Sequence, residues 1–313
     1  MERREFLKSA LAGSVAAGIA RGSTKPVPKR RYRDDVELSV IGFGGIVVCS
    51  QSQADADREV ARSFERGINY FDVAPSYFDG EAEIKLGNAL RPYRKKVFLA
   101  CKTTERDAAG ARQELERSLE RLHTDHFDLY QFHAVTTMED VEKILGPGGA
   151  AETFLKAKQE GKVKYLGCSA HSEEAALAMI DRFHLDSILF PINFVAMTQS
   201  NFGPRVIARA KEKGTARLAL KALALTPWQG KDDPGRSAHP KAWYKPVEER
   251  ELVEKALRFT LSEDITAAIP PGDEKIYEMA LELAPEFRPL SASEREALVA
   301  RARSLKPLFP IAG

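Results

Sequence analysis

The sequence predicts an α/β protein of the (β/α)8 TIM-barrel class. Short apolar runs alternate with longer charged, amphipathic stretches, and the alternation recurs eight times along 313 residues, a length that single barrel domains commonly reach. Parallel strands that are buried on both faces read as continuous apolar runs, and the stretches between them have the period of helices that cover a sheet. The barrel domain is predicted to span residues 34–313.

The eight apolar runs are the predicted strands 41–48, 68–74, 97–103, 127–134, 163–170, 187–193, 216–225 and 265–270. The predicted helices are 54–66, 81–90, 108–121, 150–160, 173–183, 204–213, 247–261 and 275–283. Because there are eight strands and eight helices, a closed barrel is favoured over an open doubly wound sheet. A further amphipathic stretch, 293–305, is predicted to be an extra C-terminal helix on the outside of the barrel.

Residues 1–20 are predicted to be a twin-arginine signal peptide. Arg3 and Arg4 precede an apolar pair, an uncharged stretch of small residues follows, and Gly18-Ile19-Ala20 has the small-x-small pattern of a cleavage site. The uncharged stretch is about 12 residues long, whereas a membrane-spanning helix needs about 20. The alternative is a basic N-terminal helix. The signal implies the twin-arginine export machinery as a partner and a periplasmic or otherwise exported location.

The segment that follows, residues 21–33, is polar, basic and proline-containing, and is predicted to be a linker. The net charge of the chain is +2, and cationic and anionic residues are interleaved, so nucleic acid is not a predicted partner. The three cysteines, Cys49, Cys101 and Cys168, form no CxxC pair and have no zinc-site spacing with histidine, so no metal site is predicted. The glycines of 42–45 lack the G-x-G-x-x-G spacing of a dinucleotide fingerprint.

Polar residues at the ends of successive predicted strands define a candidate active site. Asp72, Lys102, His133 and Ser169 end strands two to five, and Tyr77 lies in the loop after Asp72. Active sites of barrels form at the C-terminal ends of the strands, so these side chains are expected to meet at one mouth. Each residue could separately be a helix cap, a surface lysine, an interface aromatic or a core histidine, but their joint occurrence favours a shared catalytic role.

The set of Asp72, Tyr77, Lys102 and His133 fits the reduction of a carbonyl. Such a reaction needs a hydride at carbon and a proton at oxygen. A phenol with a pKa of about 10 is a poor acid alone. The ammonium of Lys102 would lower the pKa of Tyr77, Asp72 would keep Lys102 in place and charged, and His133 would orient the carbonyl oxygen.

Several segments around these residues resemble the aldo/keto reductase family: 67–77, 83–87, 100–103, 130–133, 161–169 and 269–272. The resemblance covers roughly residues 36–285. It implies NAD(P)-dependent reduction of an aldehyde or ketone to an alcohol, or the reverse, with Tyr77 as general acid/base, Lys102 lowering its pKa, Asp72 anchoring the lysine and His133 orienting the carbonyl. It also implies an N-terminal β-hairpin, at about residues 32–40, that plugs the base of the barrel.

The cofactor implied by the resemblance is NADP or NAD, and its predicted contacts are Gly45, Ile46, Ser169, Asn193, Lys221, Gly272, Asp273 and Glu274. The sequence departs from the family at this side of the site. Strand seven has no aromatic residue to stack on the nicotinamide, and Trp228 is a candidate replacement. Asp273 and Glu274 would repel the 2′-phosphate of NADP and favour NAD, while Lys275 leaves NADP open.

Two loops, 194–202 and 226–244, are predicted to cover the mouth, and the second is either a lid or a mobile surface loop. The expected substrate is a small carbonyl compound or alcohol, and the sequence does not indicate an oligomeric state. Two alternatives to the reductase remain. One is a low-turnover nucleotide-binding or partner-binding barrel; the other is a lyase or isomerase that uses Tyr77 and Lys102 without a nicotinamide.

Overall fold

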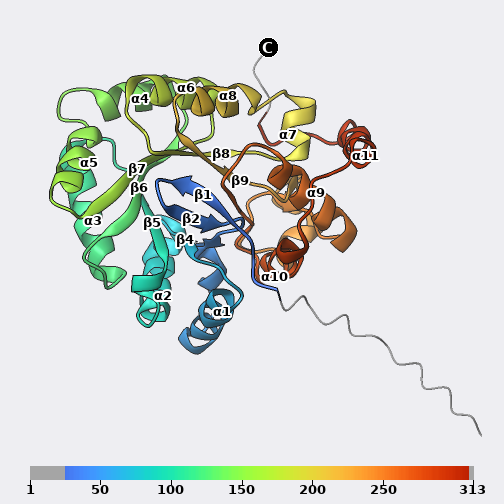
Figure 1. The fold of residues 1–313 in the computed structure, drawn as a ribbon, viewed down its shortest axis with the longest axis horizontal. Helices are drawn as coiled ribbons and strands as arrows, with labels where there is room; N and C mark the ends of the chain where they lie inside the picture. Colours follow the sequence, from blue (N-terminus) through green and yellow to red (C-terminus); the bar gives the residue numbers. More distant parts are fainter. Residues whose placement is uncertain (1–24, 310–313) are drawn as a thin grey trace, which may run out of the picture.

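The computed structural model describes residues 25–309, in which eight parallel strands form a nearly closed barrel surrounded by helices (Figure 1). The barrel strands are β3 (Phe43–Gly44), β4 (Tyr70–Asp72), β5 (Phe98–Thr103), β6 (Phe127–Val135), β7 (Val163–Ala170), β8 (Ser187–Pro191), β9 (Ala216–Leu220) and β12 (Ala267–Ile269). Neighbours in the chain are neighbours in the sheet. The ring closes where the amide of Gly42 donates to the carbonyl of Ala268 at 2.9 Å. The predicted fold class is therefore confirmed.

A helix follows every barrel strand, close to the bounds predicted from the sequence. These helices are α1 (Gln53–Glu65), α2 (Glu81–Leu90), α3 (Ala108–Arg121), α5 (Ala150–Gln159), α6 (Glu173–Arg182), α8 (Pro204–Glu212), α9 (Arg250–Ser262) and α10 (Glu274–Leu283). Further short helices, which were not predicted, are α4 (Met138–Leu145), α7 (Phe194–Gln199) and the 3₁₀ turns Gly45–Val48, Tyr77–Gly80, Arg94–Lys96, Pro234–Ala238 and Ala284–Glu286. The start of α4 carries a sequence signal, because Thr137 and Asp140 form a capping box.

The N-terminal hairpin consists of β1 (Lys29–Arg33) and β2 (Val36–Ser39), paired antiparallel. Tyr32 of this hairpin belongs to an apolar cluster inside the barrel. The centroid of its ring lies 5.1 Å from that of Phe98 and 5.4 Å from that of Tyr165. Both partners lie near the starts of their strands, so the hairpin closes the N-terminal end of the barrel and leaves the other end as the mouth. The predicted plug is confirmed, and Figure 1 shows it across the centre of the ring.

The predicted linker, residues 21–33, extends too far along the chain. Its last five residues form β1, because their backbone pairs with β2 and the side chains of Arg30 and Arg33 bind groups of the barrel domain. Arg30, for example, donates to the carbonyls of Ile265 and Leu261 at 2.9 and 2.7 Å. A basic segment that looks like solvated chain is thereby part of the folded domain.

Strands one and seven are shorter than predicted. The first ends at Gly44, where the chain turns into a 3₁₀ helix. The seventh ends at Leu220, because Lys221 has a φ of 63° and leaves the strand conformation. The apolar residues beyond it form β10 (Ala224–Thr226), which pairs with β11 (Lys245–Pro246) in a separate two-stranded sheet. Because the residues that follow each strand end are also apolar, the sequence pattern does not show where strands one and seven stop.

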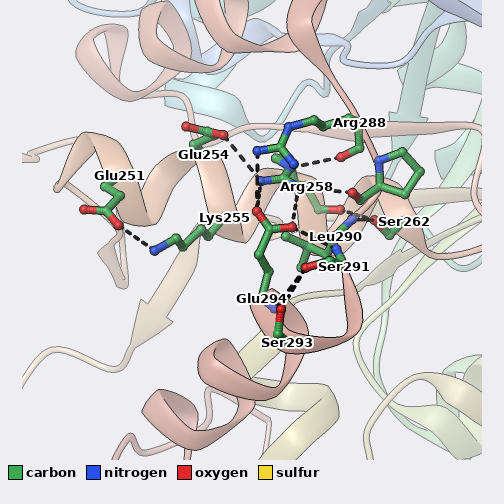
Figure 2. A network of polar contacts seen from close by, with 11 residues as sticks. Glu251, Glu254, Lys255, Arg258, Ser262, Arg288, Leu290, Ser291, Ser293 and Glu294 are labelled. Atoms are coloured by element: carbon green, nitrogen blue, oxygen red, sulfur yellow. Dashed lines mark hydrogen bonds and ion pairs between the residues drawn. The ribbon is translucent and has the colours of Figure 1, made fainter.

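The extra C-terminal helix is α11 (Ala292–Ala302), which packs on α7 and α9. Figure 2 shows how Arg258 of α9 binds the turn that precedes α11. The guanidinium donates to the carbonyls of Arg288 and Pro289 at 2.9 and 3.1 Å, and to both carboxylate oxygens of Glu294 at 2.8 Å. Ser291 and Glu294 also form the capping box that starts α11.

The predicted signal peptide, residues 1–20, lies outside the described residues. Between residues 25 and 309, no helix has the length and apolar character needed to cross a membrane. In the same part of the chain, no group of three or more histidine, cysteine, aspartate or glutamate side chains could bind a metal ion.

Candidate active site

A cavity of about 330 Å³ opens at the mouth of the barrel, at the C-terminal ends of the strands. It brings together residues from all around the ring, including Asp72, Tyr77, His133, Ser169 and Lys221. The sequence-predicted catalytic residues therefore meet at one place.

Lys102, at the end of β5, lies at the centre of the polar contacts beneath this cavity. Its ammonium donates to a carboxylate oxygen of Asp72, to the hydroxyl of Tyr77 at 3.2 Å and to the carbonyl of Val73 at 3.2 Å. Lys102 is fully buried and Asp72 is 2% exposed. Burial of a charge is costly unless the charge is paired, so the lysine and the carboxylate stabilise each other.

The second oxygen of Asp72 has partners that the sequence analysis missed. The side-chain amide of Gln131 donates to it at 2.9 Å, and the hydroxyl of Tyr70 donates at 3.3 Å. Gln131 precedes His133 by two residues in β6, and Tyr70 precedes Asp72 by two in β4. Because side chains two apart in a strand point to the same face, this spacing was a usable signal.

The pKa of Tyr77 is raised, contrary to the expected lowering by Lys102. Burial of the phenol raises the pKa, and the nearby ammonium lowers it only in part. The charge of Lys102 is already compensated, since Asp72 raises the pKa of this lysine above its usual value against the opposite effect of burial. Tyr77 is therefore protonated at neutral pH and is placed to donate a proton.

His133 lies against the edge of Tyr77, with 5.6 Å between the ring centroids. Its Nδ1 is 3.4 Å from the hydroxyl of Ser76. Burial, and then the charge of Lys102, lower the pKa of His133 well below its usual value, so the imidazole is neutral. When Ser76 donates to Nδ1, the proton resides on Nε2 and is available to a ligand in the cavity.

Four of the predicted cofactor residues line the cavity: Ile46, Ser169, Lys221 and Gly272. Gly272 approaches Ile46 so closely that a Cβ at this position would lie 2.3 Å from the isoleucine Cγ2. Gly45 lies behind the wall, where a Cβ would be 2.7 Å from Val73. Only glycine fits either position without displacing its neighbour.

The other three predicted cofactor residues already have protein partners. Asn193 caps α7 by accepting from the amide of Ala196 and does not line the cavity. Asp273 caps α10 and contacts Nδ1 of His239 at 2.8 Å. Glu274 accepts from Lys241 and Gln51. The two carboxylates are thus occupied within the fold, which removes the reason for preferring NAD over NADP.

The loop 226–244 reaches the cavity at its C-terminal end, where Lys241, Trp243 and Tyr244 are part of the lining. Trp228, the candidate for stacking on a nicotinamide, is not among the lining residues. Its ring stacks against that of His239, with 6.4 Å between the centroids and 24° between the planes, and its indole N–H donates to the carbonyl of Ala242 at 2.9 Å. Trp228 therefore supports the loop, and the aromatic wall of the cavity comes from later residues.

The end of the chain also reaches this rim. The centroid of the Phe309 ring lies 5.2 Å from that of Phe202, 5.6 Å from that of His171 and 6.4 Å from that of Trp243. Both His171 and Trp243 line the cavity. Sequence analysis did not anticipate the contributions of His171 and Phe309, because neither belongs to a motif and their proximity depends on how α11 packs.

The model of the aldo/keto reductase family matches residues 40–293. This chain belongs to the aldo/keto reductase family. It is 24% identical over 296 residues to the uncharacterized oxidoreductase YqkF of Bacillus subtilis, covering 84% of this chain and 92% of that protein. Aldo-keto reductase YhdN of the same organism is 31% identical over 156 residues, which are 44% of this chain and 45% of YhdN.

Solved aldo-keto reductases share the fold. The holo form of AKR11C1 from Bacillus halodurans has a TM-score of 0.68 at 23% identity, covering 91% of this chain and 100% of that one. An aldo-keto reductase from Klebsiella pneumoniae, in complex with NADPH, has a TM-score of 0.64 at 21% identity over 88% and 96% of the two chains. Family and fold together imply NAD(P)-dependent carbonyl reduction by an oxidoreductase.

Proposed function

We propose that this protein reduces an aldehyde or ketone to an alcohol, and catalyses the reverse oxidation, with Tyr77 as the general acid/base. The observation that carries the proposal is the contact between the Tyr77 hydroxyl and the Lys102 ammonium, 3.2 Å apart at the wall of the cavity. His133 lies at the same wall, so two proton-bearing groups face one position where a carbonyl oxygen can bind.

The residues divide the work of a reduction as follows. A bound NAD(P)H supplies the hydride that adds to the carbonyl carbon. The Tyr77 hydroxyl donates its proton to the carbonyl oxygen, and Lys102 stabilises the phenolate that remains. Asp72 keeps Lys102 charged and fixed, and the neutral His133 donates a hydrogen bond to the same oxygen. In the oxidation, Tyr77 accepts the proton.

The residues of the cavity fit a nicotinamide cofactor in part. Ser169 is 1% exposed and lines the cavity, and its side chain makes no hydrogen bond to another described residue, so its hydroxyl is available to a ligand amide. Ile46 and Gly272 form a close-packed wall that a planar ring could contact. We infer that these three residues contact the cofactor, and we keep both NADP and NAD as candidates.

The replacement Tyr77→Phe tests the assignment of the acid. We expect kcat for aldehyde reduction to fall by roughly 10²- to 10⁴-fold, because the ring is retained and only the proton donor is lost. Absorbance of NADPH or NADH measures turnover, and protein fluorescence measures nucleotide binding. Tyr165→Phe is the matched control, since this phenol lies at the opposite end of the barrel.

Two results would contradict the proposal. Tyr77→Phe with near wild-type turnover would remove Tyr77 as the acid. Tight nucleotide binding without turnover of any aldehyde, ketone or alcohol by the wild type would favour the nucleotide-binding or partner-binding barrel.

We also propose that the protein is exported by the twin-arginine machinery, on the basis of Arg3, Arg4 and the small-residue stretch that follows. A fusion of residues 1–25 to a folded reporter should reach the periplasm. Replacement of both arginines by lysine should retain the reporter in the cytoplasm, and unchanged export after that replacement would refute the proposal.

A further inference from the structure

A second lysine, Lys221, lines the cavity at the point where β9 ends. Its φ of 63° is a left-handed conformation that side-chain-bearing residues rarely adopt. Consecutive residues of a strand point to opposite faces, but this turn lets both Leu220 and Lys221 line the cavity. Strained backbone at such a position is commonly associated with function.

The ammonium of Lys221 lies over two aromatic rings and has no anionic partner. It is 4.8 Å from the centroid of Trp243 and 5.0 Å from that of Tyr244. Within residues 25–309, the ammonium of Lys221 makes no hydrogen bond and no ion pair, and only the backbone carbonyl of this residue accepts a hydrogen bond, from the amide of Ala224 at 3.0 Å. Aromatic faces stabilise a cation only in part. The site therefore holds a positive charge that the fold does not neutralise.

The rest of the cavity does not supply the missing negative charge. Asp72 is the only carboxylate among the described residues that line it, and Lys102 already binds Asp72. Lys241, another cation of the lining, is paired with Glu274. Burial, and then the charge of Lys102, lower the pKa of Lys221 to about 8, so most of it is charged at neutral pH.

Lys221 faces the catalytic side of the cavity. Its charge contributes to the lowered pKa values of both His133 and His171. Its aromatic neighbour Tyr244 is close enough to Tyr77 for the two phenols to interact electrostatically. An anion on Lys221 would thus lie near the proposed carbonyl position.

We propose that Lys221 binds an anionic group of the substrate, so that the preferred substrates are carbonyl compounds that carry a carboxylate or phosphate. This inference rests on the proposed reductase function. An ammonium without a partner, beside a proton donor, would gain a charge-assisted hydrogen bond from such a group. The pyrophosphate of the nucleotide is the other anion that could reach it, and the test separates the two sources.

The first experiment compares 4-carboxybenzaldehyde with methyl 4-formylbenzoate, which have the same reacting group and differ in charge. We expect the wild type to prefer the acid. Lys221→Met should lower the ratio of kcat/KM for acid over ester by roughly 10- to 100-fold, the loss expected for one hydrogen bond to a charged group. Lys221→Arg should retain most of the preference.

Lys245→Met is the matched control, because it removes one positive charge from the neighbouring strand β11, outside the cavity. Its acid-to-ester ratio should equal that of the wild type. An unchanged ratio in Lys221→Met would overturn the proposal. A weaker affinity of Lys221→Met for NADPH or NADH, with the ratio unchanged, would assign the lysine to the cofactor instead.

The second experiment needs no turnover and uses benzoate as the probe. Benzoate binding should change the fluorescence of Trp243, which contacts Lys221, and Lys221→Met should abolish the saturable change. If the wild type turns over neither these aldehydes nor any other aldehyde, ketone or alcohol tested, the reductase proposal fails, while loss of benzoate binding in Lys221→Met still supports the anion site. Equal benzoate binding by the two proteins would overturn the anion site.

Discussion

Lys102 and Lys221 lie at the mouth of the same barrel, yet only one of the two lysines has an anionic partner in the protein. On the side of β4–β6, Asp72 pairs with Lys102 and raises its pKa. On the side of β9–β11, Lys221 has aromatic neighbours and a pKa lowered to about 8. The charge of Lys102 is compensated within the protein, whereas the charge of Lys221 is available to an anionic ligand. Paired and unpaired lysines therefore predict different responses to mutation and pH.

The largest expected effect comes from Lys102→Met. This variant should lose roughly 10²- to 10⁴-fold in kcat and be destabilised by roughly 3–5 kcal/mol, because Asp72 is left as a buried charge without its partner. Steady-state kinetics and urea denaturation measure the two effects.

Addition of Asp72→Asn to that variant should restore much of the stability but no activity. The comparison would break if Lys102→Met kept wild-type stability, since the pair would then not behave as part of the fold.

A second prediction concerns pH. Lys221 is charged below its pKa of about 8 and neutral above it, so the preference for the acid aldehyde should fall as pH rises above 8, by up to about tenfold for each pH unit, and level off at the ratio of Lys221→Met. The kcat/KM of the methyl ester provides the reference, because it shares the titration of every other group. Lys221→Arg should show no such fall, and a wild-type preference that persists at pH 10 would contradict the assignment.

A third prediction is that Lys221→Met is more stable than the wild type at neutral pH, by roughly 1–3 kcal/mol, because a charge without an anionic partner is removed from a partly buried position. The folded pKa of Lys221 is about 8 and its ordinary value is 10.5. The cost of the charge is therefore fully present below pH 8 and disappears between these two values. Denaturation at neutral and alkaline pH should show a difference that shrinks as pH rises.

The smallest effect should come from a site remote from both lysines. Arg258→Lys removes several of the contacts shown in Figure 2 and should increase hydrogen exchange across α11. Because Phe309 lies beyond this helix, we expect KM to change within about threefold. Glu254→Gln is the control, since its contact with Arg258 is longer, at 3.4 Å. Equal exchange in both variants would show that Arg258 does not secure the helix.

The half of the site that holds the proposed catalytic residues could be predicted from the sequence because these residues follow the ends of successive strands. Asp72, Lys102 and His133 each end a regular strand, and barrel geometry then brings them together. The raised pKa of Tyr77 could not be predicted, because it depends on the balance between burial and a cation already paired with Asp72.

The other half of the site depends on irregular backbone, which apolar patterning does not reveal. The apolar residues before and after Lys221 form one continuous run in the sequence, although the left-handed conformation of Lys221 ends the strand there. Likewise Asp273 and Glu274 resemble ligand contacts in the sequence, whereas His239 and Lys241 from a long loop bind them in the fold. Predictions at this rim require the path of loop 226–244, which local sequence rules do not define.

The ties around Arg258 have a consequence for engineering. One guanidinium secures the turn from which α11 starts, and the chain beyond α11 brings Phe309 to the rim of the cavity. We therefore expect that residues 288–309 can be exchanged as one segment between related barrels, provided that position 258 of the recipient is an arginine. Such chimaeras would vary the wall of the cavity while the proposed proton-transfer residues stay unaltered.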